Sequence, residues 1–337
     1  MFSHPSYSST TVVTMKSFFG LFILAYFHQL GCLADGDDAI VLRNLEIRGN
    51  EDAVKLLQYP THKKVRLNNA EIPYLTVEIL GHLKSIKVLK IGYSILKTIH
   101  VLPQLETLHL DASRVSEVII NPVDSFDLEE LIVIRGDLTK LPANITTLGK
   151  LRKLRLRSCK IEYVNADDLS GLQHLESIDL GHNRIASVSS SAVKLPQLEL
   201  LDLSFNRLVE VNFKNWNAPK LREINLSVNK LTIAASILQS FPHLHDLLLS
   251  GNQWHCSWRD YIVNEAKARD VAIDSPPLCD EASVTALIDS QSKFDRLEML
   301  IANLREELGK AYQEIERLQG LNSDLVEAFY RYTIEKV

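Results

Sequence analysis

The sequence predicts an α/β repeat solenoid followed by a helical coiled coil, and three observations support this. An apolar frame recurs every 23 or 24 residues from Leu105 onward, leucine supplies about one residue in six, and a heptad pattern occupies the C-terminal end. The 337 residues carry a formal net charge of −5 and 46% hydrophobic residues, as in ordinary globular proteins. With 37 Lys and Arg against 42 Asp and Glu, no broad positive field exists, so no nucleic-acid partner is expected.

The N-terminal segment has the pattern of a secretory signal peptide. Lys16 precedes an apolar run at residues 18–27 (FFGLFILAYF), and Ala34 precedes an acidic stretch. We expect cleavage after Ala34, so that residues 1–34 are removed and the protein is secreted, with Met15 as an alternative start. The other interpretation is an uncleaved signal anchor, but the run is shorter than the ~20 residues that span a bilayer. We expect no membrane span elsewhere in the chain.

Residues 35–252 carry the repeats. The frame L-x-x-L-x-L-x-x-N/C-x-L fits ten times, with first anchors at Leu42, His62, Ile86, Leu105, Leu128, Leu151, Leu175, Leu198, Leu221 and Leu244. In x-x-L-x-L the apolar residues alternate with period two, which predicts a short strand with leucines inward and other side chains on an exposed face. One copy cannot bury its apolar face, but stacked copies can. These features indicate a leucine-rich repeat horseshoe with a concave parallel sheet.

The ninth position of the frame predicts the regularity of each turn. The last four copies have asparagine there, whose amide can satisfy backbone groups of the buried turn: Asn183, Asn206, Asn229 and Asn252. The first copy is expected to place Leu42, Leu45, Ile47 and Asn50 in the frame. The next four copies have Ala70, Ser94, Ser113 and Gly136 at the ninth position, so we expect the early half to be less regular. In the sixth copy Cys159 stands there, which indicates a buried free thiol.

The segment 253–284 resembles the cysteine-bearing C-terminal cap of extracellular leucine-rich repeat proteins. The resemblance rests on the motif N-x-W-x-C at residues 252–256, although Trp258 stands where a further cysteine is usual. It implies a cap in which only one of the usual two disulfides is left, between Cys256 and Cys279. The alternative is that Cys279 pairs with another chain.

The segment 285–337 predicts a coiled coil, because apolar residues recur at a and d positions over about six heptads. The expected oligomerisation residues are Phe294, Leu297, Ile301, Leu304, Leu308, Ile315, Leu318, Asn322, Leu325 and Phe329. Asn322 is the polar exception, and a buried amide at an a position fixes the register of partner helices. We expect a homo- or hetero-oligomer through this helix; the alternative is packing on the repeats of the same chain.

Outward positions of the predicted strands give candidate ligand contacts. The sixth strand carries a basic strip, and acidic and aromatic side chains follow on later strands. The candidates are Lys153, Arg155, Arg157, Asp179, His182, Asp202 and Phe205. Such a strip could hold an anionic glycan or an acidic protein patch. The alternative is a solvated strand face.

Two N-x-S/T sequons begin at Asn144 and Asn225, which makes them candidate glycosylation sites in a secreted protein. Asn144 is expected on a convex turn. Asn225 is expected on the concave strand, where a glycan would block part of the sheet.

The sequence offers little support for catalysis or metal binding. His243 and His245 flank Leu244, an anchor of the repeat, and this placement disfavours a zinc site. No serine, histidine and carboxylate set shares a structural context, and no glycine-rich phosphate loop occurs. We therefore expect no enzyme, no metal and no cofactor.

The chain has a predicted signal peptide, about ten repeats, a cap with fewer cysteines than usual and a predicted coiled coil, in this order. This order of segments resembles that of the leucine-rich immune proteins of mosquitoes. The resemblance implies a secreted haemolymph protein of innate immunity that associates through its C-terminal region. It further implies recognition of pathogen surface glycans or carriage of a complement-like thioester protein. The chain departs from the disulfide-linked members in having no spare cysteine in its cap and tail. The alternative is an extracellular leucine-rich repeat protein of adhesion, matrix or receptor regulation without an immune role.

Overall fold

The computed structural model describes residues 33–35, 39–56, 62–83, 85–274 and 278–280. These belong almost entirely to the first of two compact units, Met1–Cys279, which is the unit described below. The apolar run of the predicted signal peptide and the predicted coiled coil lie outside the described residues. The expected cleavage point after Ala34 falls within the first strand of the main sheet.

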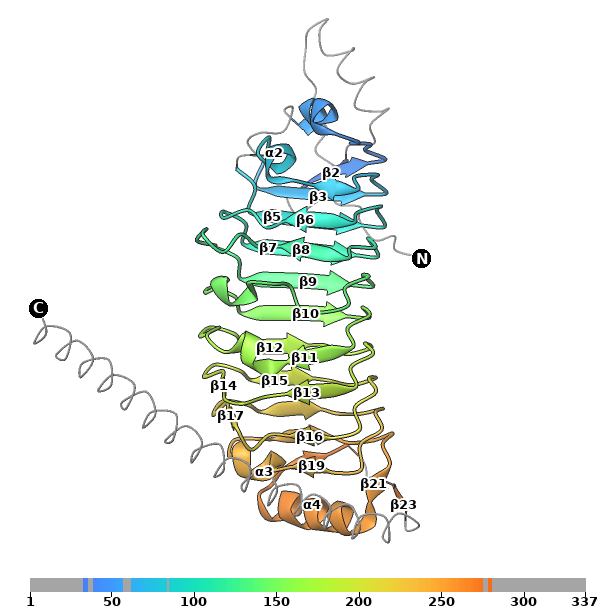
Figure 1. The fold of residues 1–337 in the computed structure, drawn as a ribbon, viewed down its shortest axis with the longest axis vertical. Coiled ribbons are helices and arrows are strands. Elements are labelled where there is room, and N and C mark those ends of the chain that lie inside the picture. The colour runs from blue at the N-terminus through green and yellow to red at the C-terminus, as the bar shows by residue number, and fades with distance from the viewer. Residues whose placement is uncertain (1–32, 36–38, 57–61, 84, 275–277, 281–337) are drawn as a thin grey trace, which may run out of the picture. The chain divides into compact units, whose positions relative to one another are not determined.

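One long sheet runs through the unit, with one strand per copy of the frame (Figure 1). Its strands, in spatial order, are β1 (Leu33–Asp35), β2 (Ala39–Arg43), β3 (Lys64–Asn68), β5 (Val88–Gly92), β7 (Thr107–Asp111), β9 (Glu130–Ile134), β10 (Lys153–Arg157), β12 (Ser177–Asp179), β15 (Leu200–Asp202), β18 (Glu223–Asn225), β20 (Asp246–Leu248) and β22 (Ala272–Ile273). β1 pairs antiparallel with β2, and all later neighbours are parallel. The parallel solenoid that the frame predicts is therefore confirmed.

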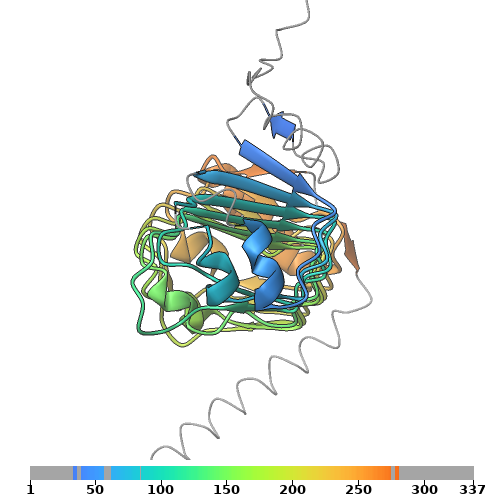
Figure 2. The same ribbon diagram turned by 90° about the horizontal axis from the view of Figure 1, so that it is seen from above.

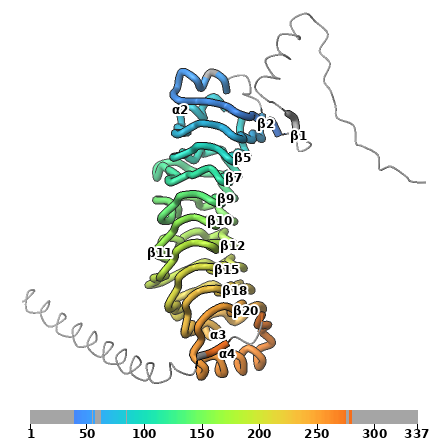
Figure 3. The backbone as a smooth tube through the Cα atoms, turned by 90° about the vertical axis from the view of Figure 1, so that its right-hand side faces the viewer, coloured from blue at the N-terminus to red at the C-terminus, as the bar shows by residue number. Residues whose placement is uncertain are grey.

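The return segments are short strands and short helical segments, on the side opposite the main sheet (Figure 2). The small sheets are β4 (Tyr74–Leu75), β6 (Thr98–His100) and β8 (Glu117–Ile119); β11 (Tyr163–Asn165) and β13 (Ser187–Ser189); β14 (Val193–Lys194) and β17 (Trp216–Asn217); β16 (Val211–Asn212) and β19 (Ala234–Ala235). The helical turns are η1 (Asn50–Leu56), α2 (Val77–Leu80), η2 (Ile145–Thr147), η3 (Ala166–Leu169) and α3 (Ile237–Ser240). Because strands stack about 4.8 Å apart and these returns are narrow, the column bends only gently (Figure 3).

The core is one continuous apolar cluster between the main sheet and the returns. From the third copy onward each copy contributes its three anchors; in the sixth copy Leu151, Leu154 and Leu156 are all buried. Burying one leucine stabilises the fold by about 1.5–3 kcal/mol relative to leaving it exposed. Since the anchors of one copy touch those of the next, the stack is a chain of neighbour contacts.

The asparagines at the ninth position form a ladder of hydrogen bonds in the late copies. The Nδ2 atom of Asn206 donates to the carbonyl oxygens of Leu180 and Leu203, both at 3.0 Å, and its Oδ1 accepts from the backbone N–H of Ile185 at 3.0 Å. Asn183, Asn229 and Asn252 repeat this pattern. Each amide therefore ties its own turn to the preceding copy.

The early copies vary in length, since the first anchors His62, Ile86 and Leu105 are 24 and 19 residues apart, but the expectation that the early half is less regular is wrong for the strands. β3, β5, β7, β9 and β10 each have five residues in continuous parallel register, whereas the later strands have two or three. Serine replaces much of the asparagine ladder: Ser113 Oγ donates to the carbonyl oxygens of Ile91 at 3.1 Å and Asp111 at 2.9 Å. Backbone pairing along the longer strands satisfies the remaining groups.

The expected register of the first copy is also wrong. β2 pairs with β3 so that Ile40 lies beside Val65 and Leu42 beside Leu67. Ile40 and Leu42 are therefore the strand anchors, and Leu45 takes the ninth position, in register with Ala70. Asn50 begins η1 instead of closing a strand turn.

The cap consists of β21 (Trp254–His255), α4 (Cys256–Ala268), β22 and β23 (Cys279–Asp280). Cys256 and Cys279 form a disulfide with their Cα atoms 4.9 Å apart. The Trp254 ring is buried and stacks on Trp258 at a centroid distance of 4.3 Å. The tryptophan in place of the missing cysteine thus covers the end of the apolar core. Within the described residues no helix is long and apolar enough to cross a membrane.

Candidate ligand-binding face

The outward side chains of the main sheet form rows that cross the strands. In-register pairing places residues about 23 apart in sequence beside one another, at the ~4.8 Å spacing of neighbouring strands. One row reads, in spatial order, Arg66, Lys90, His109, Ile132, Arg155, Asp179, Asp202 and Asn225. This row is basic at its N-terminal end and acidic at its C-terminal end, so the face carries a gradient of charge.

The basic strip predicted on β10 is paired with carboxylates. Lys153 Nζ lies 2.7 Å from Glu130 Oε1, and Arg155 Nε lies 3.0 Å from Asp179 Oδ2. Arg157 Nη1 lies 3.0 Å from Asp179 Oδ1 and 2.9 Å from the Asp202 carboxylate. These pairs leave the strip with less positive charge for an anionic ligand than the sequence suggests.

Arg157 is the centre of this network. Its side chain is 29% exposed, Asp179 is 11% exposed and Asp202 is 16% exposed, so the pairs are shielded from water. Burial alone would lower the pKa of Arg157, but the two carboxylates outweigh it and raise that pKa. Gly181 makes room for the guanidinium, since a Cβ at this position would lie 2.5 Å from Arg157 Nη1.

The structure brings His182 and Phe205 together at the edge of the same face. Their rings stack with centroids 4.0 Å apart and an interplanar angle of 9°. Both residues have positive φ, in a position that takes the left-handed conformation in successive copies. The residues at that position are Asn44, Asn69, Tyr93, Ala112, Arg135, Ser158, His182, Phe205, Val228 and Gly251. Alternation in the frame predicts that these side chains point outward, but not that two of the rings stack.

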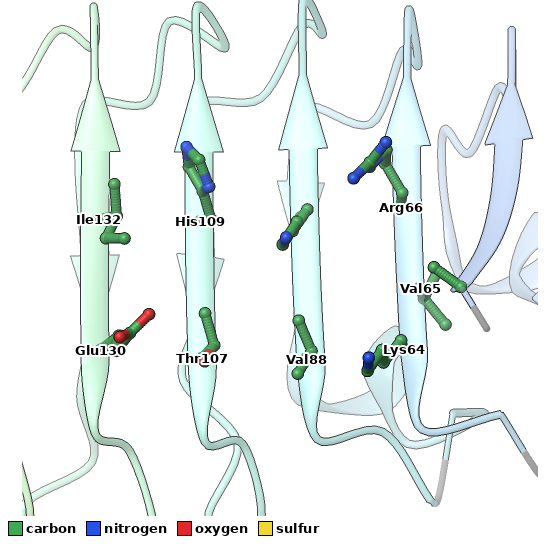
Figure 4. Close-up of a pocket in the computed structure, with 10 residues that line it drawn as sticks. Lys64, Val65, Arg66, Val88, Thr107, His109, Glu130 and Ile132 are labelled. Carbon is green, nitrogen blue, oxygen red and sulfur yellow. The ribbon is translucent and has the colours of Figure 1, made fainter. Parts of the chain in front are cut away.

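A basic pocket lies on the early half of the face, over β3, β5, β7 and β9 (Figure 4). The cavity measures about 220 Å³, and its lining includes Lys64, Arg66, Lys90, His109 and Glu130. A second cavity of about 260 Å³ shares Arg66, Lys90 and His109 with the first. These positions are outward in the frame, but only the register shows that three basic side chains are direct neighbours.

The two sequons lie on opposite sides of the solenoid. Asn144 is exposed before η2, and its Nδ2 donates to the carbonyl oxygen of Ile120 at 3.1 Å. Asn225 is half-buried on β18, and its Oδ1 accepts from the backbone N–H of Ser227 at 3.0 Å. Glycosylation of either residue stays a prediction.

The histidines considered as metal ligands do not converge. His243 and His245 are exposed on either side of buried Leu244. Within the described part of the chain, no group of three or more His, Cys, Asp or Glu is placed to hold a metal ion.

Comparison with known proteins agrees with this geometry. Residues 149–208 match the leucine-rich repeat family. No curated protein matches the chain. The chain therefore contains leucine-rich repeats, and the solved structures below show the same fold.

The LRIM1/APL1C complex matches with 20% identity and a TM-score of 0.55, over 82% of this chain and 60% of that chain. The LRIM1 leucine-rich repeat domain matches with 19% identity and a TM-score of 0.50, over 70% and 82%. The TLR13–ssRNA13 complex matches with 24% identity and a TM-score of 0.53, over 64% and 33%. At these identities the likeness shows the fold alone. The chain spans 60% of the matched LRIM1/APL1C chain, less than two thirds of its length.

Proposed function

We propose that the protein is a secreted, non-catalytic binding scaffold of innate immunity. The observation that carries this proposal is the continuous parallel sheet, whose outward side chains form charged rows across many copies. A long open face of this kind suits a large partner, because repeat proteins bind through extended inner surfaces. We place its ligand among pathogen surface glycans or a complement-like thioester protein.

The immune role is supported by two likenesses. The order of segments resembles the mosquito leucine-rich immune proteins, and the fold is similar to the LRIM1 leucine-rich repeat domain. A second similar structure is a complex of LRIM1 with APL1C, which favours an assembly of two chains here as well. In this proposal residues 285–337 form the coiled coil that joins the partners.

Sedimentation of the full secreted chain tests the assembly. We expect a dimer or larger oligomer for the natural chain and a monomer for the double variant Ile301→Asp, Leu308→Asp, because both residues are at a positions of the heptad. The matched control, Ala302→Asp with Asn303→Asp, adds the same charge at b and c positions and should remain oligomeric. A natural chain that sediments as a monomer would remove the assembly from the proposal.

Challenge with bacteria or parasites tests the immune role. We expect secretion to rise after challenge, and we expect affinity capture from the native body fluid to recover a thioester protein or the chain to bind intact pathogens. Constant secretion with capture of matrix proteins or receptors alone would instead support an adhesion or receptor-regulating role.

A further inference from the structure

We propose that Arg66, Lys90 and His109 form a binding site for a tetrahedral oxyanion, a phosphate or sulfate group carried by a larger extracellular molecule. The site lies in the early copies, away from the predicted strip on β10. This proposal rests on the proposed use of the sheet as a binding face and specifies the chemistry of one ligand.

The three side chains are nearest neighbours across parallel strands. Arg66 on β3 is in register with Lys90 on β5, and Lys90 is in register with His109 on β7. Figure 4 shows Arg66 and His109 on the same face of the sheet, with Lys64 next to Arg66 along the strand. Like charges directly opposite one another on a sheet are destabilising. An anion beside Lys90 would lessen the repulsion between Lys90 and Arg66.

Two nearby carboxylates are engaged with other cations. Glu130, which lines the pocket, lies 2.7 Å from Lys153 Nζ, and Asp111, one row away, lies 2.7 Å from Arg135 Nη2. Within the described residues Lys90 has no carboxylate at ion-pair distance. In contrast, the cations of β10 are each matched by an acid.

His109 adds a polar atom that lacks a partner. Its Nε2 is buried, and no hydrogen-bond partner is found for it among the described residues. A buried ring nitrogen of this kind is costly unless something satisfies it. Burial, and then the charges of Lys90, Arg155 and Arg66, lower the pKa of His109, while Asp111 opposes them. An oxyanion that the imidazole turns to meet would satisfy the nitrogen and favour protonation of the ring.

The size and the donors of the pocket select the chemical class. At about 220 Å³ the cavity is below the ~300 Å³ at which pockets for whole small ligands begin, so it suits one charged group of a larger molecule. A phosphate has three acceptor oxygens and a charge of about −1.5 to −2, which matches an Arg fork, a Lys and a protonated His. A carboxylate has two coplanar oxygens and a single charge. The adjoining cavity, which reaches Tyr93, gives room for the rest of the ligand.

Sulfate is the first probe, because its charge does not change between pH 5.5 and 7.5. We expect calorimetric titration of the full chain at constant ionic strength to show saturable binding that strengthens about threefold or more as the pH falls, since His109 then gains a proton. The groups that face His109 are Arg66, Lys90, Glu130 and Arg155 from neighbouring strands and Asp111 from its own strand.

Variants separate the roles of the two residues. Lys90→Ala should weaken sulfate binding about tenfold at every pH, as expected for loss of one charge-assisted hydrogen bond. His109→Gln should abolish the pH dependence. The matched controls are Lys194→Ala and His174→Gln, which change exposed residues elsewhere and should bind as the natural chain does. Lys90→Ala should also raise the melting temperature at low salt without sulfate, because it removes a repulsion; a structural lysine would lower it.

Larger probes distinguish the possible sources of the anion. A sulfated polysaccharide and phosphatidylcholine vesicles containing a phosphomonoester lipid should be compared with phosphatidylcholine vesicles alone. We expect one of the charged probes to bind more tightly than sulfate and to lose affinity in Lys90→Ala. Absence of sulfate binding, equal loss in Lys194→Ala, or sulfate binding that neither probe improves would overturn the proposal. None of these outcomes depends on oligomerisation or on an immune response, so they leave the proposed function to its own tests.

Discussion

Arg157 and Asp202 are 45 positions apart in sequence, yet Arg157 Nη1 donates to Asp202 Oδ2 at 2.9 Å. Arg157 is on β10 and Asp202 is on β15, so the guanidinium reaches across β12 and also contacts Asp179 on that strand. Charges on this face are therefore shared by three successive copies. This relationship couples neighbouring copies through their surface as well as through the apolar core.

Removing the central cation should destabilise the middle of the solenoid. In Arg157→Met, Asp202 loses its arginine and Asp179 loses one of two, while both carboxylates stay shielded from water. We expect a loss of about 1–3 kcal/mol, measured as a lower midpoint of urea unfolding. Arg152→Met is the matched control, since Arg152 is half-exposed and pairs with Glu176 at the surface, where ion pairs contribute about 0–1 kcal/mol. Equal losses would contradict a special role for Arg157.

A methyl group at Gly181 should disturb the same network without changing any charge. The Cβ of Gly181→Ala would lie 2.5 Å from Arg157 Nη1 and 3.2 Å from Asp179 Oδ1, so the guanidinium must move. We expect a loss of stability comparable to that of Arg157→Met, and little further loss when the two changes are combined. Additive losses in this double-mutant cycle would show that Gly181 acts elsewhere. Gly149→Ala is the control, because no atom lies within 4 Å of a Cβ built there.

Loss of one amide from the asparagine ladder should be costly. Asn206→Ala leaves the carbonyl oxygens of Leu180 and Leu203 and the N–H of Ile185 without this partner in a buried turn. We expect unfolding to require about 2–3 kcal/mol less free energy. The exposed Asn215→Ala should change stability by less than about 0.5 kcal/mol. A similar effect of both changes would show that the ladder adds little.

The late copies could be predicted from sequence because their apolar anchors and their turn asparagines indicate the same register of the frame. The first copy could not, since Leu42, Leu45 and Ile47 are apolar at a spacing that fits two registers. Only pairing of β2 with β3 selects the register in which Leu45 takes the turn position. The regular strands of the early copies could not be predicted either. There, Ser113 and the longer strands satisfy backbone polar groups that asparagine satisfies in the later copies.

The outward direction of the candidate side chains followed from the alternation of the frame, but their interactions did not. The frame shows that Arg155 and Arg157 share a face, yet their charges are balanced by acids one and two copies later. Conversely, the frame alone does not show that Lys90 lacks such an acid among the described residues, or that His109 has a buried nitrogen without a partner. Pairing of long side chains depends on stacking distances that no single copy encodes.

Cys159 should be chemically inert in the folded protein. Its side chain is buried, and burial raises the pKa of the thiol from 9.0 to about 11. Because the thiolate is the nucleophile, we expect iodoacetamide at pH 8 to label Cys159 very slowly, and to label it readily in concentrated guanidinium chloride. Peptide mapping by mass spectrometry measures both rates at this residue.

The raised pKa of Cys159 also makes the stability of the fold depend on pH. The folded state favours the neutral thiol below pH 9, and this contribution to stability is lost as the pH rises from about 9 to about 11. Cys159→Ala should lack that part of the alkaline loss, and rapid labelling of the folded chain at pH 8 would contradict a buried thiol.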